Sequence, residues 1–313
     1  MQYFLIIMGI ALFFIVWTLI EQKLLVTTQY DVSSSKLPIG CDNTKFVVLA
    51  DLHNYTFGRN NERLVRRIEV LEPAFIIVAG DMIHKREACY PSNAYTLLEQ
   101  LAKKYKIYYA YGNHEQKVDT LQSKNDLDTS VELKQTRSLI ESEQQSQNPS
   151  STWVEYKERL KQLGVTFLDN QSVDVVINKN KVRISGVSIG RDYFKRSQYP
   201  DMEENYLSSL LGSKKEDQFQ ILIAHNPVYF NWYLEWGADL TISGHLHGGM
   251  VRVPGLGGIV SPQVKLFPKY DGGKFIKNKR TMIVSRGLGS HSLMPRYFNV
   301  PEVVQVTLKN LEK

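Results

Sequence analysis

The chain has 313 residues, of which 43% are hydrophobic and 22% are charged. These are ordinary values for a globular protein and leave room for one large domain or two small ones. The two cysteines, Cys41 and Cys89, exclude a disulfide framework. The formal net charge of +6 suits a negatively charged substrate or an anionic membrane surface, but it does not distinguish between them.

The first twenty residues contain no charged side chain and are almost wholly apolar. About 20 such residues are needed to cross a bilayer. Tyr3 and Trp17 lie near the two ends of the segment, where interfacial aromatic residues are typical. A cleaved signal peptide is the alternative, but the segment lacks its basic start and small-residue cleavage site. We therefore predict an uncleaved transmembrane anchor over residues 1–20 and a single-pass cell-membrane protein.

The side of the membrane that carries the domain is weakly specified. Lys23 and Lys36 follow the anchor and slightly favour a cytoplasmic domain, but large domains cross membranes largely regardless of such charges. Residues 21–43 contain a serine run and Pro38 and are interpreted as a tether, with an extended piece at 24–29. The remainder, residues 44–313, is predicted to be the catalytic domain.

Three apolar strands alternate with amphipathic helices in the first part of this domain. The strands are expected at residues 46–50, 75–79 and 107–110. The helices between them are indicated by apolar stripes at helical spacing, among them Leu64 and Ile68. This alternation is typical of parallel βαβ units.

The pattern breaks at residues 116–151, which are rich in Gln, Ser and charged residues. This polar insertion has two interpretations: a solvated, partly disordered segment, or a lid over a site. The sequence alone leaves both open.

The second half is expected to form another sheet. A helix at 153–163 precedes strands at 165–168, 173–177 and 182–187, which indicate a switch to antiparallel pairing. A helix at 202–211 follows, and then strands at 221–224 and 240–243 with a short aromatic core helix between them. Strands at 281–284 and 303–308 are expected to close this second sheet. The predicted fold is α/β, a four-layer α/β/β/α sandwich of two mixed sheets.

Five of these strands end in metal-binding side chains. A hard oxygen donor and an imidazole at one strand end are half of a metal site, and open α/β sheets build their sites at the carboxyl ends of strands. The side chains that follow the strands in this way are Asp51, His53, Asp81, Asn113, His114, His225, His245 and His247.

The ordered motifs Asp-x-His, Gly-Asp, Gly-Asn-His-Glu, a lone His and Gly-His-x-His resemble the calcineurin-like metallophosphoesterases, in particular the bacterial membrane-anchored type. Related bacterial proteins are often taken to face outward, so the resemblance weakly favours an extracytoplasmic domain. It also implies two divalent metal ions. Asp51, His53 and His247 would hold the first ion, Asn113, His225 and His245 the second, and Asp81 would bridge them. The mixed oxygen and nitrogen donors favour Mn²⁺, with Fe or Zn²⁺ as alternatives.

In this scheme a hydroxide shared by the metals attacks phosphorus directly, without a covalent intermediate. The resemblance gives His114 the role of acid or hydrogen-bond donor near the leaving oxygen. Arg191, Arg286 and Arg296 are candidates to bind phosphate, although each is more commonly a surface or structural residue. His84 is interpreted as a surface loop residue, and His291 as part of a glycine-rich loop.

The predicted function is a membrane-anchored phosphoesterase that hydrolyses a phosphodiester or pyrophosphate bond. The anchor suggests a lipid-linked substrate, such as a phospholipid or a nucleotide-activated lipid precursor like UDP-diacylglucosamine. One alternative is a nucleotide phosphodiesterase or nuclease, although the anchor makes nucleic acid a less favoured partner. A second alternative is a membrane-tethered binding protein with a relic metal site, which would have lost ligands.

Overall fold

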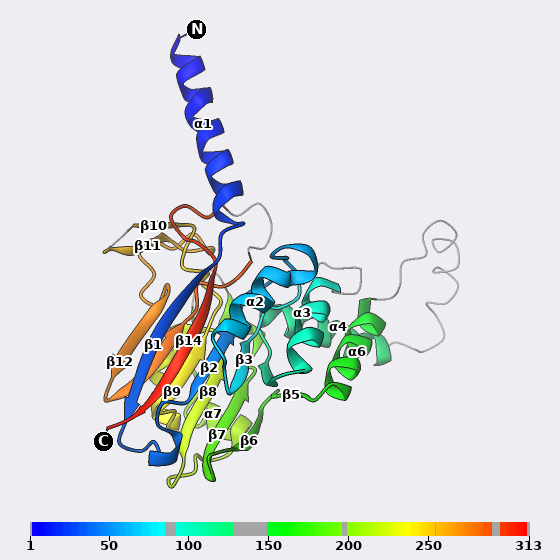
Figure 1. Cartoon of the computed structure of the whole chain (residues 1–313), viewed down its shortest axis with the longest axis vertical. Coiled ribbons are helices and arrows are strands. Elements are labelled where there is room, and N and C mark those ends of the chain that lie inside the picture. Colours follow the sequence, from blue (N-terminus) through cyan, green and yellow to red (C-terminus); the bar gives the residue numbers. More distant parts are fainter. Residues whose placement is uncertain are drawn as a thin grey trace.

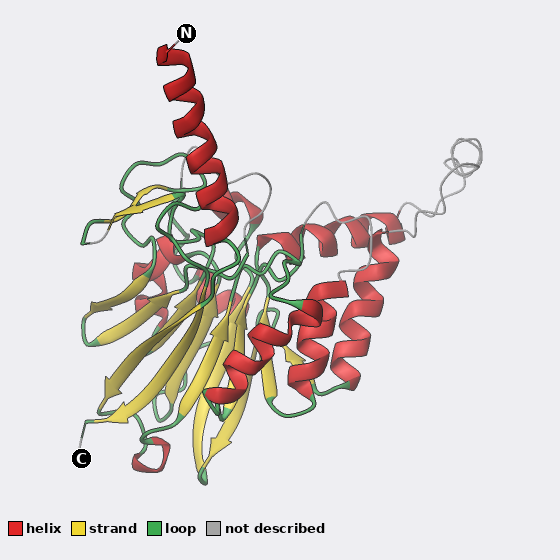
Figure 2. Cartoon of the chain, turned by 45° about the horizontal axis from the view of Figure 1, so that its top comes forward, coloured by secondary structure: helices red, strands yellow, loops and turns green. Residues whose placement is uncertain are grey.

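We describe a computed structural model of the chain over residues 2–84, 92–127, 149–195, 199–253, 255–289 and 295–311. Figures 1 and 2 show two sheets packed face to face, with helices on their outer faces and one long helix projecting from the domain. The predicted fold, with two large mixed sheets, is confirmed.

The first sheet has the strand order β1-β14-β2-β3-β4-β5. Strands β2, β3, β4 and β5 run parallel to one another, whereas β14 is antiparallel to β2 and parallel to β1. The bounds are β1 (Val26–Ser34), β2 (Lys45–Leu49), β3 (Phe75–Ala79), β4 (Lys106–Ala110), β5 (Val165–Phe167) and β14 (Glu302–Asn310).

The second sheet has the order β12-β13-β9-β8-β7-β6, with a parallel centre and an antiparallel strand at each edge. Its bounds are β6 (Gln171–Ile177), β7 (Asn180–Val187), β8 (Phe219–Ala224), β9 (Leu240–Ser243), β12 (Gly273–Lys277) and β13 (Arg280–Val284). A separate hairpin of β10 (Val251–Val253) and β11 (Gly257–Val260) lies beside the foot of the projecting helix (Figure 1).

The core consists of three apolar layers. Phe46, Ile77 and Ile221 belong to the layer between the sheets. The other face of the first sheet packs against the helices α2 (Glu62–Val70), α3 (Ser92–Ala102) and α6 (Pro149–Gln162). The outer face of the second sheet is covered by α7 (Tyr206–Leu211) and α8 (Phe230–Trp236). In α8, Phe230, Tyr233 and Trp236 are buried, so the prediction of a core helix is confirmed.

Four expectations are corrected. Residues 26–34 form an edge strand paired with β14, so much of the expected tether belongs to the domain. Strand β5 extends the first sheet in parallel instead of opening the second, and β14 also lies in the first sheet. Helix α7 begins at Tyr206, four residues after the expected start. The expected strands were correct, but an apolar strand carries no local signal for the sheet that it joins.

The polar insertion divides into described and undescribed parts. Helix α4 (Asn113–Leu127) begins at the third site strand and continues into the insertion, and α6 begins at Pro149. Residues 128–148 lie outside the described residues, as does His291. The choice between a lid and a solvated segment therefore stays a prediction.

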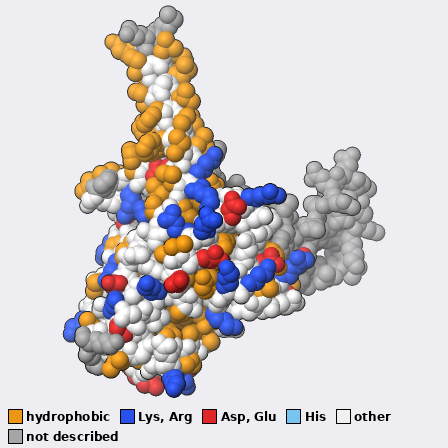
Figure 3. Space-filling model, viewed as in Figure 1, with side chains coloured by type: hydrophobic (Ala, Val, Ile, Leu, Met, Phe, Trp, Pro, Cys, Tyr) orange, Lys and Arg blue, Asp and Glu red, His pale blue; other side chains and the backbone are white. Residues whose placement is uncertain are grey.

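One helix in the described part of the chain is long and apolar enough to cross a membrane. This helix, α1 (Gln2–Glu21), has a mean hydropathy of 2.6 over its apolar window, and that window is not buried by the domain. Figure 3 shows its apolar side chains exposed along its whole described length.

Candidate metal centre

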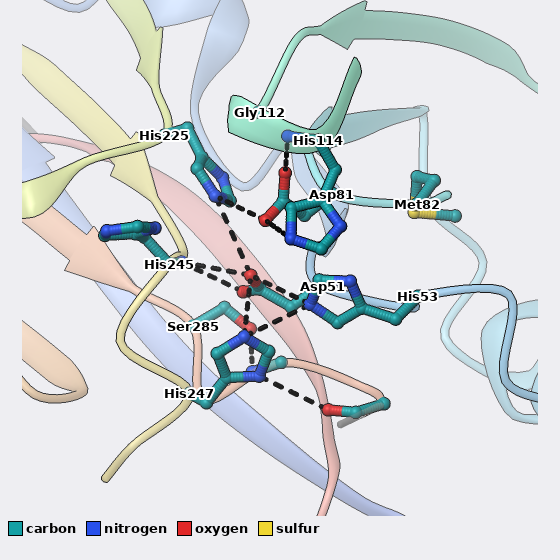
Figure 4. A network of polar contacts seen from close by, with 12 residues as sticks. Asp51, His53, Asp81, Met82, Gly112, His114, His225, His245, His247 and Ser285 are labelled. Atoms are coloured by element: carbon teal, nitrogen blue, oxygen red, sulfur yellow. Dashed lines mark hydrogen bonds and ion pairs between the residues drawn. The ribbon is translucent and has the colours of Figure 1, made fainter. Parts of the chain in front are cut away.

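The predicted ligands meet in one place, at the carboxyl ends of the parallel strands. Asp51 and His53 follow β2, Asp81 follows β3, and Asn113 opens α4 directly after β4. The remaining predicted ligands, His225, His245 and His247, follow β8 and β9 of the second sheet. The site therefore spans the joint between the two sheets (Figure 4).

Two groups of side chains have the donor spacing of a metal site. Asp51, His53 and His247 place one ligand atom each within 4.8 Å of one another. Asp81, His225 and His245 do the same, and Asp81 also lies within this range of His53 and His114. A carboxylate that reaches both groups is suited to bridge two cations.

The shortest contacts in the first group bring donor atoms face to face. His53 Nε2 lies 3.2 Å from His247 Nε2, and His247 Nε2 lies 3.4 Å from Asp51 Oδ1. In the second group, His225 Nε2 lies 3.2 Å from Asp81 Oδ2. Asn113 Oδ1 is buried and, among the described atoms, has no hydrogen-bond partner. The converging imidazoles and carboxylates form a donor set that fits divalent metal ions, and the orphaned amide oxygen of Asn113 is the kind of group that such an ion would satisfy.

Backbone groups orient the imidazoles. His225 Nδ1 donates to the carbonyl oxygen of Ala79 at 2.6 Å, which leaves Nε2 directed at the carboxylates. His247 Nδ1 lies 3.3 Å from the carbonyl oxygen of Gly289. The backbone N–H of His245 donates to the Asp51 carboxylate at 3.1 Å. Such outer contacts fix the tautomer and angle of metal-binding histidines.

Burial and neighbouring charges shift the pKa values of the buried site residues. Burial raises the pKa of Asp51 to about 7. Burial would also raise the pKa of Asp81, but His114 and His225 hold it well below its usual range. Burial alone would lower the pKa of His225, yet the Asp81 and Asp51 carboxylates raise it to about 10. The metal-free site therefore holds a proton on His225 at neutral pH, and a bound cation would displace it.

Glu115 supports the loops that carry the site, a role that no sequence pattern indicated. Its carboxylate accepts hydrogen bonds from the backbone N–H groups of Asp81 (2.8 Å), Met82 (2.8 Å) and Gly112 (2.9 Å), and from the hydroxyl of Tyr109 (2.7 Å). It thus ties the loop after β3 to the loop after β4. The tie is close because Gly112 has no Cβ, which would clash with the Asp81 side chain.

Three further side chains flank the ligands. Gln263 Nε2 lies 2.7 Å from His245 Nε2, and the hydroxyl of Tyr199 donates to Gln263 Oε1. The half-buried His84 ring packs 5.3 Å from that of His114, centroid to centroid, so this loop residue lies beside the site. Gln263 lies far from the motifs in sequence, and no pattern indicated it. His114 itself is buried, with Nε2 3.9 Å from Asp81 Oδ2.

Two of the three candidate arginines are structural. The guanidinium of Arg286 donates to Glu302 through Nε and Nη2 at 2.8 and 2.6 Å. Arg296 is buried and donates to the carbonyl oxygens of Gly287 and His247. These donors contact the protein's own groups, which favours the structural interpretation of both residues. Arg191 is exposed at the start of the 3-10 helix Arg191–Phe194.

Arg191 remains a candidate because its helix adjoins the site. Phe194, at the other end of this helix, packs edge-to-face on His245 with a centroid distance of 5.2 Å.

Comparison with known proteins identifies the family. The family model for calcineurin-like phosphoesterases matches residues 44–249, about two thirds of the chain. The chain therefore belongs to the calcineurin-like phosphoesterase family and is a metal-dependent hydrolase of phosphoric esters.

Three curated relatives resemble the chain over most of its length. The uncharacterized metallophosphoesterase YkuE of Bacillus subtilis is 24% identical over 93% of this chain and 88% of its own length. The UDP-2,3-diacylglucosamine pyrophosphatase LpxG of Chlamydia muridarum is 24% identical over 91% of this chain and 89% of its own. A bovine transmembrane protein with a metallophosphoesterase domain is 25% identical over 72% of this chain and 45% of its own.

Proposed function

We propose that the protein is a membrane-anchored phosphoesterase that uses two divalent metal ions to hydrolyse a phosphodiester or pyrophosphate bond in a lipid-linked substrate. The observation that carries the proposal is the pair of three-residue donor groups that share the neighbourhood of Asp81. Residues Asp51, His53 and His247 would hold one ion, and Asn113, His225 and His245 the other. Manganese is the favoured ion, with Fe or Zn²⁺ as alternatives.

When bound, such ions acidify water near neutral pH and neutralise charge on phosphate oxygens. The protein's own residues supply the rest. Asp81 belongs to the second donor group and also lies close to His53 of the first, so it would bridge the two ions; its carboxylate accepts from the backbone N–H of His114 at 2.8 Å. The His114 ring packs against His53 and His84 and would donate a proton to the leaving oxygen. Arg191 is proposed to bind a substrate phosphate at the rim.

The membrane part of the proposal rests on α1 and on the relatives. The printed function of LpxG, a pyrophosphatase of UDP-2,3-diacylglucosamine, supports a lipid-linked diphosphate as the substrate class. The apolar length of α1 supports a single span of the cell membrane. The earlier expectation that the domain faces outward stays a prediction.

The test uses the full chain in detergent, stripped of metal and then supplied with Mn²⁺, Fe²⁺, Zn²⁺ or Mg²⁺. We expect metal-dependent cleavage of bis(p-nitrophenyl) phosphate and of a UDP-linked diacyl lipid. Changes to groups that only support a metal ligand cost about 10–100-fold in activity. Because Asp81 is proposed to be a ligand itself, Asp81→Asn should lower this activity by more than about 100-fold. The matched control is Asp174→Asn, which changes a partly exposed carboxylate on the edge strand β6 that is paired with Arg183.

Other outcomes would redirect or overturn the proposal. A preference for p-nitrophenyl phosphate would indicate a monoesterase, and cleavage of nucleotides without lipid would favour the nucleotide phosphodiesterase. Absence of both metal binding and turnover would contradict the proposal that the protein is an enzyme and would favour the membrane-tethered binding protein.

A further inference from the structure

The topology places α1 at the same edge of the sheets as the metal centre. Strand β14 is antiparallel to β2, and β1 is parallel to β14. Strand β1 therefore begins at the edge where β2 ends and where Asp51 lies. Because α1 leads into β1, the helix leaves the domain beside the site (Figure 1).

The foot of α1 is fixed to a loop that also supports the ligands. Phe14 packs on Tyr297 and Trp17 on Phe298, with centroid distances of 5.3 and 5.6 Å. Glu21 Oε2 accepts from the backbone N–H of Phe298 at 2.8 Å. In the same loop, Arg296 donates to the carbonyl oxygen of the ligand residue His247.

Large exposed apolar side chains lie on the loops connected to this foot. We define the apolar collar as five residues with exposed fractions of 72, 73, 69, 65 and 56%: Leu256, Val264, Leu266, Phe267 and Phe298. The collar is continuous through the backbone. The backbone N–H of Tyr297 donates to the carbonyl oxygen of Met250, the residue before β10. Val260, at the end of β11, forms an isolated antiparallel β-bridge with Leu266. Together with α1, the collar makes one apolar surface at the site edge.

Three collar residues lie in the left-handed region of φ. Val264, Phe267 and Phe298 have φ values of 62°, 47° and 56°. This conformation costs about 1–2 kcal/mol for an ordinary L-residue and suits Gly or Asn far better. The two loops that carry these residues thus hold apolar side chains outward at a cost in free energy, as is typical of functional segments.

Basic groups lie on the flank of the same foot. Arg63 Nη1 donates to the carbonyl oxygen of Lys23 at 3.1 Å, and Arg67 Nη2 donates to that of Leu25 at 3.3 Å. Figure 3 shows basic side chains gathered on the domain beneath α1. Cations beside an apolar surface are the pattern that binds anionic headgroups at a bilayer.

We propose that the apolar collar inserts into an anionic lipid bilayer around α1, which holds the metal centre at the level of the headgroups. The loop that carries Val264, Leu266 and Phe267 also carries Gln263, whose amide contacts His245. Insertion of this loop would therefore hold the Gln263 amide in its contact with the proposed ligand His245. This inference deepens the proposed function, because it lets a lipid-linked substrate reach the site without leaving the membrane.

The experiment measures depth in the membrane and needs no turnover, so its failure is separable from failure of the proposed hydrolysis. Full-length protein with Cys89→Ser is reconstituted in phosphatidylcholine–phosphatidylglycerol vesicles, and an environment-sensitive dye is attached at Leu266→Cys. Val176→Cys on β6 is the matched control, because Val176 is 64% exposed but lies next to a turn at the opposite edge. Lipids with spin-labelled acyl chains should quench the dye at position 266 several-fold more than at 176. Equal quenching would overturn the proposal.

A second variant covers the case in which the dye itself drives insertion. Val264→Asn with Phe267→Asn removes two collar side chains while relieving the left-handed backbone, so it should fold at least as well. Quenching at position 266 should then fall several-fold. Unchanged quenching in this folded variant would show that the collar does not insert.

Discussion

The two edges of the sheets use the same unusual backbone conformation for different purposes. At the edge away from the site, positive φ values occur at Asn178 and Lys179 and at Asn278 and Lys279, which form two-residue hairpin turns. Such turns require this conformation, and Asn tolerates it. At the site edge it falls on five of the seven proposed ligands: Asp51, His53, Asp81, His245 and His247.

The difference shows that the left-handed backbone has a different cause at each edge. In a hairpin turn the turn geometry itself requires this conformation, so it explains the residues found there. At the site edge, histidine and aspartate adopt the left-handed region because their side chains must converge from several loops. Strain of about 1–2 kcal/mol per residue is tolerated there, and the buried network around Glu115 stabilises it.

The largest expected effect of the four changes below is on catalysis. Replacing His114 by Ala should lower turnover of bis(p-nitrophenyl) phosphate by about 10²–10⁴-fold, the usual contribution of a general acid. The metal content should be unchanged, because His114 is not among the proposed ligands. Loss of metal from the variant, measured by elemental analysis, would show that His114 is a ligand instead.

Glu115→Ala tests whether the hydrogen bonds to the Glu115 carboxylate stabilise the loops at the site edge. The change leaves the buried N–H groups of Asp81, Met82 and Gly112 without their acceptor, at about 1–3 kcal/mol for each unsatisfied group. We expect the free energy of unfolding to fall by at least about 3 kcal/mol in chemical denaturation. Glu115→Gln keeps one acceptor oxygen and should lose less. A loss below about 1 kcal/mol in Glu115→Ala would contradict the supporting role.

The metal-free protein should respond to pH at the site edge. The pKa of His225 is raised from 6.5 to about 10, so its protonation contributes stability that is complete below about pH 6.5 and disappears toward pH 10. The pKa of Asp81 is held well below its usual value, so this carboxyl stays ionised throughout pH 7–10 and its contribution to stability is constant there. The thermal midpoint of stripped protein should therefore fall between pH 7 and 10. With metal bound, that fall should be much smaller.

The smallest effect is expected at the opposite edge. Lys179→Gly removes the left-handed penalty at φ +67°, partly offset by the greater entropy of Gly in the unfolded chain. The free energy of unfolding should rise by at most about 1 kcal/mol, with metal content and turnover unchanged. A change in turnover would show that the two edges are coupled and would break the comparison.

The sequence predicted which side chains lie close together better than it predicted which sheet each strand joins. Asp51, Asp81 and His225 each follow an apolar strand, and strand ends converge by a general rule of parallel sheets, so local patterns sufficed. The sheet membership of β5 and β14 depends on distant pairing, which leaves no local signal.

The supporting contacts were also beyond the sequence. Glu115 stands inside a motif but acts through backbone groups of two other loops, and Gln263 reaches His245 only through the folded chain. Arg286 and Arg296 were candidates for phosphate because a sequence does not show which donors are already used.

The most direct test of the central claim is a count of the metal ions and their positions in active full-length protein, by elemental analysis with anomalous diffraction. The proposed ligand groups predict two ions per chain, one beside Asp51, His53 and His247 and one beside His225 and His245, with Asp81 between them. Active protein with one ion, or with ions elsewhere, would contradict the claim that this strained edge is a two-metal centre.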